Sequence, residues 1–74
     1  MDHVERIREL REDNDKTQKE IAEYLGIAQR TVAGYEQRRI RIPVNSLIKL
    51  AKFYNVDMNY ICGLTHEKQS FQGK

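Results

Sequence analysis

This sequence has no apolar run that approaches the roughly 18 residues of a membrane-spanning helix, and no signal-peptide pattern opens it. We therefore expect a cytoplasmic protein with no part in a membrane. It has a single cysteine, Cys62, so no disulfide can form within the chain. The apolar neighbours Ile61 and Leu64 indicate that Cys62 is a small buried side chain rather than a reactive thiol.

Catalytic and metal-binding patterns are missing as well. The histidines His3 and His66 lie near opposite ends of the chain, without a cysteine or another histidine at ligand spacing. No histidine stands near a serine or Cys62 in an arrangement typical of a nucleophile and its base, and there is no glycine-rich phosphate-binding loop. We expect neither a metal site nor a cofactor, and we expect that the protein is not an enzyme.

The chain of 74 residues is long enough for one small hydrophobic core and too short for two domains. Its net charge of +2 hides an uneven distribution. Residues 1–25 carry eight acidic and five basic side chains, whereas residues 26–52 carry one acidic and six basic side chains. A surface that faces nucleic-acid phosphates requires such a basic region; a chance clustering of arginines in a loop is the alternative.

Residues 17–37 predict two helices joined by a tight turn. Apolar residues recur at helical spacing up to Leu25, and Gly26 then supplies a residue that adopts positive φ without a steric penalty. Ala22 and Val32 provide the small residue and the compact apolar residue needed where two helices cross at roughly 90 to 120°. This pattern indicates a helix-turn-helix, with an ordinary helical hairpin as the alternative. Polar residues on the outward side of the second helix favour the helix-turn-helix.

Further helices are predicted on both sides of this pair. Residues 1–13 form the first, and Thr17 with Glu20 gives a capping box at the start of the second. A fourth helix has Pro43 in its first turn, and Asp57 is the N-cap of a short fifth. Their predicted buried faces consist of Val4, Ile7 and Leu10 in the first, Val44, Leu47, Ile48, Leu50 and Ala51 in the fourth, and Tyr60, Ile61 and Leu64 in the fifth.

Four segments together resemble a known family: R-I-R-E-L-R at residues 6–11, T-Q-K-E-I-A-E-Y-L-G at 17–26, Y-E at 35–36 and L-I-K-L-A-K-F-Y-N-V at 47–56. The chain is similar to the Cro/cI-type, XRE-like helix-turn-helix domain of phage repressors and bacterial transcriptional regulators. The resemblance implies an all-α fold, a compact five-helix domain of the lambda-repressor-like DNA-binding type, whose helices 2 and 3 form the helix-turn-helix. We expect this domain over residues 1–65 and a mobile tail over residues 66–74.

The chain departs from the family pattern at a few positions. Asp15 and Arg38 stand where the family has glycine, usually at the first position and often at the second, and Lys16 stands where an apolar residue is usual. Ala28 replaces the usual capping residue, so the third helix begins without that cap. The changes at Asp15 and Lys16 predict modest local stability rather than a different fold.

The resemblance also implies an ion pair between Arg11 on the first helix and Glu36 at the end of the third. Spacing alone does not predict this pairing, and two separate surface charges are the alternative. If the pair forms, removing either partner strands a charge and costs about 3 to 5 kcal/mol.

These features predict a sequence-specific, double-stranded DNA-binding transcriptional regulator, a repressor, whose third helix lies in the major groove. By resemblance, Gln29 contacts base edges, where its amide suits adenine, and Arg30 suits guanine. Gly34 costs about 1 kcal/mol within a helix, which a close approach of the backbone to DNA explains. The predicted base contacts are Gln29, Arg30, Thr31 and Gly34, and the predicted phosphate contacts are Gln18, Arg38, Arg39, Arg41 and Asn45.

We expect a homodimer, at least on DNA, and a pseudo-palindromic operator, because a single recognition helix discriminates too few base pairs. The apolar side chains of Met58, Tyr60, Ile61 and Leu64 are the expected dimer surface; the alternative is that they only close the monomer core. Two other functions remain open. One is the antitoxin of a toxin–antitoxin pair, which also holds a protein partner. The other is a helical protein-interaction module, against which the polar residues Gln29 and Arg30 argue.

Overall fold

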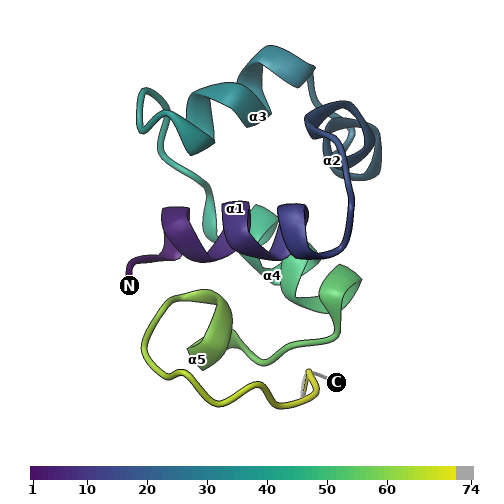
Figure 1. The fold of residues 1–74 in the computed structure, drawn as a ribbon. Helices are drawn as coiled ribbons and strands as arrows, with labels where there is room; N and C mark the ends of the chain where they lie inside the picture. Colours follow the sequence, from purple (N-terminus) through teal and green to yellow (C-terminus); the bar gives the residue numbers. More distant parts are fainter. Residues whose placement is uncertain (72–74) are drawn as a thin grey trace.

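The computed structural model describes residues 1–71, which form helices joined by short loops and contain no strand. The elements are α1 (His3–Asp13), α2 (Gln18–Leu25), α3 (Gln29–Glu36), α4 (Val44–Tyr54) and α5 (Met58–Ile61). Helices α1 and α4 form a middle layer, with α2 and α3 on one side of it and α5 on the other (Figure 1). The prediction of an all-α, five-helix domain is confirmed.

Side-chain caps fix where three of the helices begin. The Asp2 carboxylate accepts a hydrogen bond from the Glu5 backbone amide at 2.9 Å, so α1 begins at His3 rather than at the first residue. The predicted capping box at α2 is present, because Thr17 and Glu20 each bond the other's backbone amide. At α5 the Asp57 carboxylate accepts from the Tyr60 amide at 2.8 Å, as predicted.

Residues with a left-handed backbone conformation follow the ends of several helices. Gly26 has a φ of 72° at the end of α2, which is the conformation predicted for the turn. Asp15, at 55°, and Arg38, at 63°, adopt the same region at positions where the family has glycine. A non-glycine residue pays about 1 to 2 kcal/mol for this conformation, so tight turns form here at a local cost in stability.

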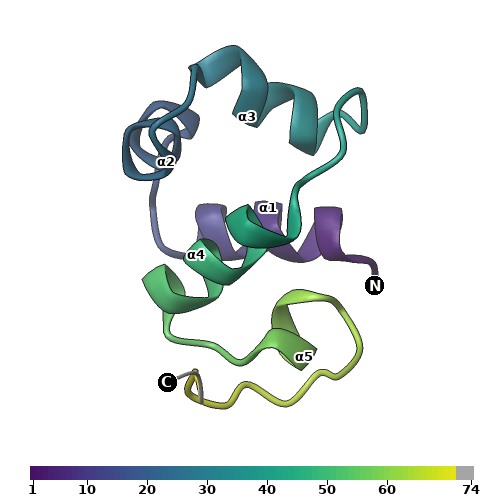
Figure 2. The same cartoon turned by 180° about the vertical axis from the view of Figure 1, so that it is seen from behind.

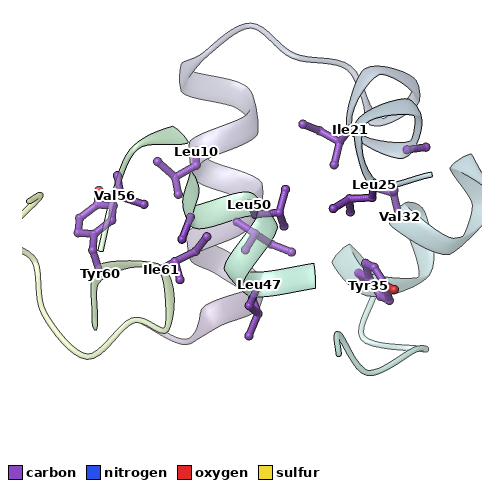
Figure 3. Close-up of a cluster of buried hydrophobic side chains, with 13 residues drawn as sticks. Leu10, Ile21, Leu25, Val32, Tyr35, Leu47, Leu50, Val56, Tyr60 and Ile61 are labelled. Atoms are coloured by element: carbon purple, nitrogen blue, oxygen red, sulfur yellow. The ribbon is translucent and has the colours of Figure 1, made fainter. Parts of the chain in front are cut away.

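One continuous core lies between the layers. Ile21, Leu25, Val32 and Tyr35 approach α4 from one side, and Val56, Tyr60 and Ile61 approach it from the other (Figure 3). The buried apolar residues are Val4, Ile7, Leu10, Ile21, Ala22, Leu25, Val32, Tyr35, Leu47, Leu50, Ala51, Val56, Tyr60 and Ile61.

The predicted burial of two residues, Val44 and Leu64, is wrong. Val44, the first residue of α4, is 66% exposed, and the buried face of this helix begins only at Leu47. Leu64 is 77% exposed because the chain turns at Gly63, which has a φ of 79°, and leaves the core. Ile48 and Cys62 are half-buried rather than buried.

The expected dimer surface also needs correction. Tyr60 and Ile61 are buried inside the monomer, where they pack against α1 and α4. Only Met58, which is half-buried, and the exposed Leu64 remain of the apolar side chains expected at that surface.

Arg6 is a buried residue that the sequence pattern does not reveal. Its side chain is among the charged positions that surround the apolar stripe of α1, yet the residue is only 1% exposed. The Arg6 guanidinium lies 3.8 Å from the centre of the Tyr60 ring, and its Nη1 donates a hydrogen bond to the Tyr60 carbonyl at 3.0 Å. Its Nε also donates to the Met1 sulfur at 3.1 Å. Arg6 therefore connects α1 to α5 through a cation–π contact and a hydrogen bond.

The described part of the tail follows the loop between α4 and α5. The Asp57 amide donates to the Gln69 carbonyl at 2.8 Å, and the Phe71 amide donates to Asn55 Oδ1 at 3.2 Å. The Phe71 side chain packs partly against the core. The remainder of the expected tail, residues 72–74, lies outside the described residues, and the mobility of residues 66–74 stays a prediction.

Candidate nucleic-acid interface

The corner between α2 and α3 is tightly packed. Ala22 and Val32 are both buried at this crossing, and the left-handed Gly26 lies between the two helices. The Ile27 amide donates to the Ala22 carbonyl at 3.0 Å, which closes the turn. The corner therefore holds α3 against α2 with one side of α3 directed away from the protein (Figure 1).

A partly buried ion pair fixes the far end of α3. Arg11 Nε and Nη2 donate to the two Glu36 carboxylate oxygens at 2.7 and 2.9 Å, so the contact is bidentate. Arg11 Nη1 also donates to the Lys16 carbonyl at 3.0 Å. The hydrogen bond with Glu36 raises the pKa of Arg11 above its ordinary value. This pair therefore ties the end of α3 to α1 and to the loop that precedes α2.

The predicted phosphate contact Gln18 takes part in the same network. Its amide nitrogen donates to Glu36 Oε1 at 3.1 Å. Because a glutamine amide carries two N–H groups, Gln18 can hold Glu36 and still offer a hydrogen bond to an external group. A phosphate contact by Gln18 stays a prediction.

The outward side of α3 is polar where the helix begins. Gln29 and Arg30 are exposed and Thr31 is half-buried. Ala28 gives no side-chain cap to the helix, as its sequence predicts. The first turn of α3 therefore presents an amide, a guanidinium and a hydroxyl group next to backbone amides that no side chain caps.

The loop that follows α3, residues 37–43, runs past the N-terminal end of α1 before α4 begins (Figure 2). We call residues 38–42 the arginine loop. Arg39 and Arg41 are both exposed, and Asn45 is exposed in the first turn of α4. Arg39 Nε donates to the Gln37 side chain at 2.8 Å. Three of the predicted phosphate contacts thus lie at the surface of one loop and the helix after it.

Arg38 differs from the other arginines of this loop. Its Nη1 and Nη2 donate to the Asp2 carboxylate at 2.5 and 3.2 Å, and Glu5 lies 3.9 Å away. The hydrogen bond from Arg38 lowers the pKa of Asp2 to about 2. In this structure the Arg38 guanidinium is paired within the protein, so a phosphate contact requires that it leave Asp2.

The structure explains Gly34 differently from the sequence. Gly34 is buried, and a Cβ built on it would lie 2.5 Å from Ile40 Cδ1. The close approach that excludes a side chain therefore comes from the arginine loop of the protein itself. The base contact predicted for Gly34 is not tested by this arrangement, and the loop gives a reason for glycine at this position that does not involve DNA.

Among residues 1–71, no helix has the length and apolar content needed to cross a membrane. Within the same residues, no three histidine, cysteine or acidic side chains converge to hold a metal ion.

The packed corner, the exposed start of α3 and the basic loop that follows α3 define a helix-turn-helix domain. A model of the Helix-turn-helix family matches residues 7–61, and the chain belongs to that family. This membership confirms the resemblance stated from the sequence and the expectation that the module is not an enzyme.

Two relatives from Bacillus subtilis (strain 168) are similar in sequence. YobD, an uncharacterized HTH-type transcriptional regulator, is 37% identical over 65 residues, which are 88% of this chain and 58% of YobD. The HTH-type transcriptional regulator ImmR is 36% identical over 58 residues, which are 78% of this chain and 46% of ImmR. The chain thus spans about half the length of these relatives.

A crystal structure of a transcriptional regulator from Listeria innocua has a similar fold. It superposes with a TM-score of 0.79 at 26% sequence identity, and the match covers 88% of this chain and 61% of that one.

Proposed function

We propose that this protein is a sequence-specific regulator of transcription that binds double-stranded DNA with α3 in the major groove and acts as a repressor. The exposed polar start of α3 carries this proposal, because Gln29 and Arg30 are exposed there and a basic loop follows the other end of the same helix. The relatives are named as transcriptional regulators, which supports the same function. A bound regulator represses when its operator overlaps the site that the transcription machinery needs.

The first turn of α3 supplies the base contacts. The Gln29 amide matches adenine N6 and N7, and the Arg30 guanidinium matches guanine O6 and N7. The Thr31 hydroxyl bonds a phosphate, or its methyl group packs against a thymine methyl. Because the Arg11–Glu36 pair and the α2–α3 corner hold α3 at both ends, these groups are presented on a fixed support.

The flanking residues supply phosphate contacts. Arg39 and Arg41 are exposed in the arginine loop, and Asn45 is exposed at the start of α4. Their contacts fix the register of the protein on the duplex without selecting a sequence, whereas contacts to base edges select it. Gln18 adds a contact from the start of α2 through the N–H that Glu36 does not use.

We further propose that two copies bind DNA together as a homodimer. One recognition helix contacts only a few base pairs, while a genome offers on the order of a million or more competing sites. Two copies on one face of the duplex bind half-sites about 34 Å apart, so the operator is a pseudo-palindrome. The exposed Leu64 and the half-buried Met58, both at the α5 end, are the remaining apolar side chains for the contact between copies.

Selection of binding sites from random duplexes, followed by footprinting and sedimentation of the complex, tests this proposal. The expected result is a pseudo-palindromic site with half-site centres about one helical turn apart, occupied by two copies. Leu64→Ala should lower cooperative binding to the full site while leaving binding to an isolated half-site unchanged. A single copy on a site without two-fold symmetry would contradict the dimer and leave the proposal for α3 standing.

A further inference from the structure

The contact between Gly34 and Ile40 joins α3 to the arginine loop. A Cβ at Gly34 would lie 2.5 Å from Ile40 Cδ1 and 2.8 Å from Ile40 Cγ1, distances too short for real atoms. Gly34 is not among the residues with positive φ, so its backbone conformation does not require glycine. An added Cβ would therefore have to displace the Ile40 side chain, which covers this position.

The backbone of Gly34 holds the same loop. The amides of Arg39 and Ile40 both donate to the Gly34 carbonyl, at 2.9 and 3.2 Å. The last turn of α3 therefore binds the loop through two hydrogen bonds and one side-chain contact, all at a single residue. Ile40 remains 43% exposed, so it covers Gly34 without becoming part of the hydrophobic core.

Ile40 lies between two arginines in the chain, so its contact with Gly34 affects where they are held. Arg39 and Arg41, two of the exposed arginines of the loop, are its immediate neighbours in the chain. Because one residue spans only about 3.3 to 3.6 Å even when the chain is extended, a shift of the Ile40 backbone also shifts the backbone from which both guanidinium groups extend.

We propose that Gly34 is a positioning residue for DNA binding, because its missing side chain makes room for Ile40 and so sets where Arg39 and Arg41 meet the phosphates. This inference rests on the proposed function and deepens it. Gly34 acts through the loop and does not touch DNA. Its role therefore lies in the strength of binding to any sequence and not in the choice of sequence.

Gly34→Ala separates this role from a role in stability. Alanine favours a helix over glycine by about 1 kcal/mol, which offsets part of the cost of displacing Ile40, so the variant should stay folded. The added Cβ should nevertheless push Ile40 away from α3. Loss of a phosphate contact lowers the slope of log affinity against log salt concentration by about one.

The experiment measures that slope for a labelled random-sequence duplex with four proteins: the unmodified protein, Gly34→Ala, Ile40→Ala and the double variant. Each single variant should lower the slope by about one, and the double variant should be no worse than either single. Ile40→Val is the matched control, because it keeps most of the contact and should retain the original slope. Circular dichroism melts check that each variant is folded.

Hydrogen exchange gives a second readout that needs no DNA. The Arg39 and Ile40 amides should exchange slowly in the unmodified protein and in Ile40→Val, and faster in Gly34→Ala. An unchanged slope in Gly34→Ala, or amides that stay protected, would overturn the positioning role alone. Losses that add in the double variant would overturn it too, since they would show that Gly34 and Ile40 act independently. An unmodified protein that binds no duplex at low salt would overturn the proposed function together with this role.

Discussion

Two arginine–carboxylate pairs lie at the end of α3: a partly buried one, here the inner pair, and an exposed one, here the outer pair. In the inner pair, the Arg11 and Glu36 side chains are 15% and 7% exposed. In the outer pair, the Arg38 and Asp2 side chains are 53% and 44% exposed. Each pair has two hydrogen bonds of its own, yet only the inner pair is largely shielded from water.

This difference in exposure decides what each pair does. A shielded charge that loses its partner stays desolvated, so the inner pair holds the helices in one arrangement. Water can replace either partner of an exposed pair, which therefore contributes little and exchanges partners readily. The inner pair thus fixes how α3 is presented, whereas the outer pair leaves Arg38 able to exchange Asp2 for a phosphate.

The largest predicted effect is on the inner pair. Arg11→Ala leaves Glu36, whose side chain is largely shielded from water, with only the Gln18 amide as a side-chain partner, and we expect a loss of about 3 kcal/mol in the free energy of unfolding. Glu36→Ala should cost a similar amount because it strands Arg11. Urea denaturation of both single variants and of the double variant measures these losses.

The double variant tests whether Arg11 and Glu36 contribute to stability as a pair. It removes both charges, so it should cost less than the two single losses combined. The exposed pair Arg8 and Glu12 on α1, whose charged atoms lie 3.5 Å apart, is the control, and its alanine variants should change the stability little. Strictly additive losses at Arg11 and Glu36 would show that the inner pair does not act as a unit.

The smallest predicted effect is on the outer pair and depends on pH. The hydrogen bonds from Arg38 and from the Glu5 amide lower the pKa of Asp2 from 3.8 to about 2. A lowered folded-state pKa means that the carboxylate contributes stability above about pH 4 and that this contribution is lost as the pH falls toward 2. Asp2→Asn removes the charge but keeps a good N-cap for α1.

Melting temperatures of the two proteins from pH 7 to pH 2 test this prediction. The unmodified protein should be slightly more stable at pH 7, and the two curves should converge as the pH falls toward 2. A difference that stays constant over the whole range would show that the Asp2 charge is not responsible.

The sequence predicts the local features of this fold better than its long-range contacts. Gly26, the capping box of Thr17 with Glu20, and the N-cap Asp57 act on neighbouring residues, so local patterns predict them. The Arg11–Glu36 pair joins residues 25 positions apart and was implied by the family resemblance alone.

Contacts between distant segments escaped prediction for the same reason. The pairing of Arg38 with Asp2 spans 36 residues, and the burial of Arg6 depends on α5, which begins at Met58. Gly34 could be recognised as unusual within a helix, but only the folded loop shows that Ile40 is the neighbour that requires it. A sequence motif predicts the helix-turn-helix, whereas these contacts depend on how the loop and α5 pack.

Selection of sites from random duplexes tests whether the start of α3 selects the DNA sequence while the loop only strengthens binding. Arg30→Ala should select a changed consensus, because losing a bidentate base contact removes about 1 to 3 kcal/mol of discrimination. Arg39→Ala and Arg41→Ala should keep the original consensus with uniformly weaker binding, and Arg8→Ala should serve as the control for loss of a positive charge elsewhere. If Arg30→Ala selects the same consensus as the unmodified protein, Arg30 does not contact the bases and the account of α3 is contradicted.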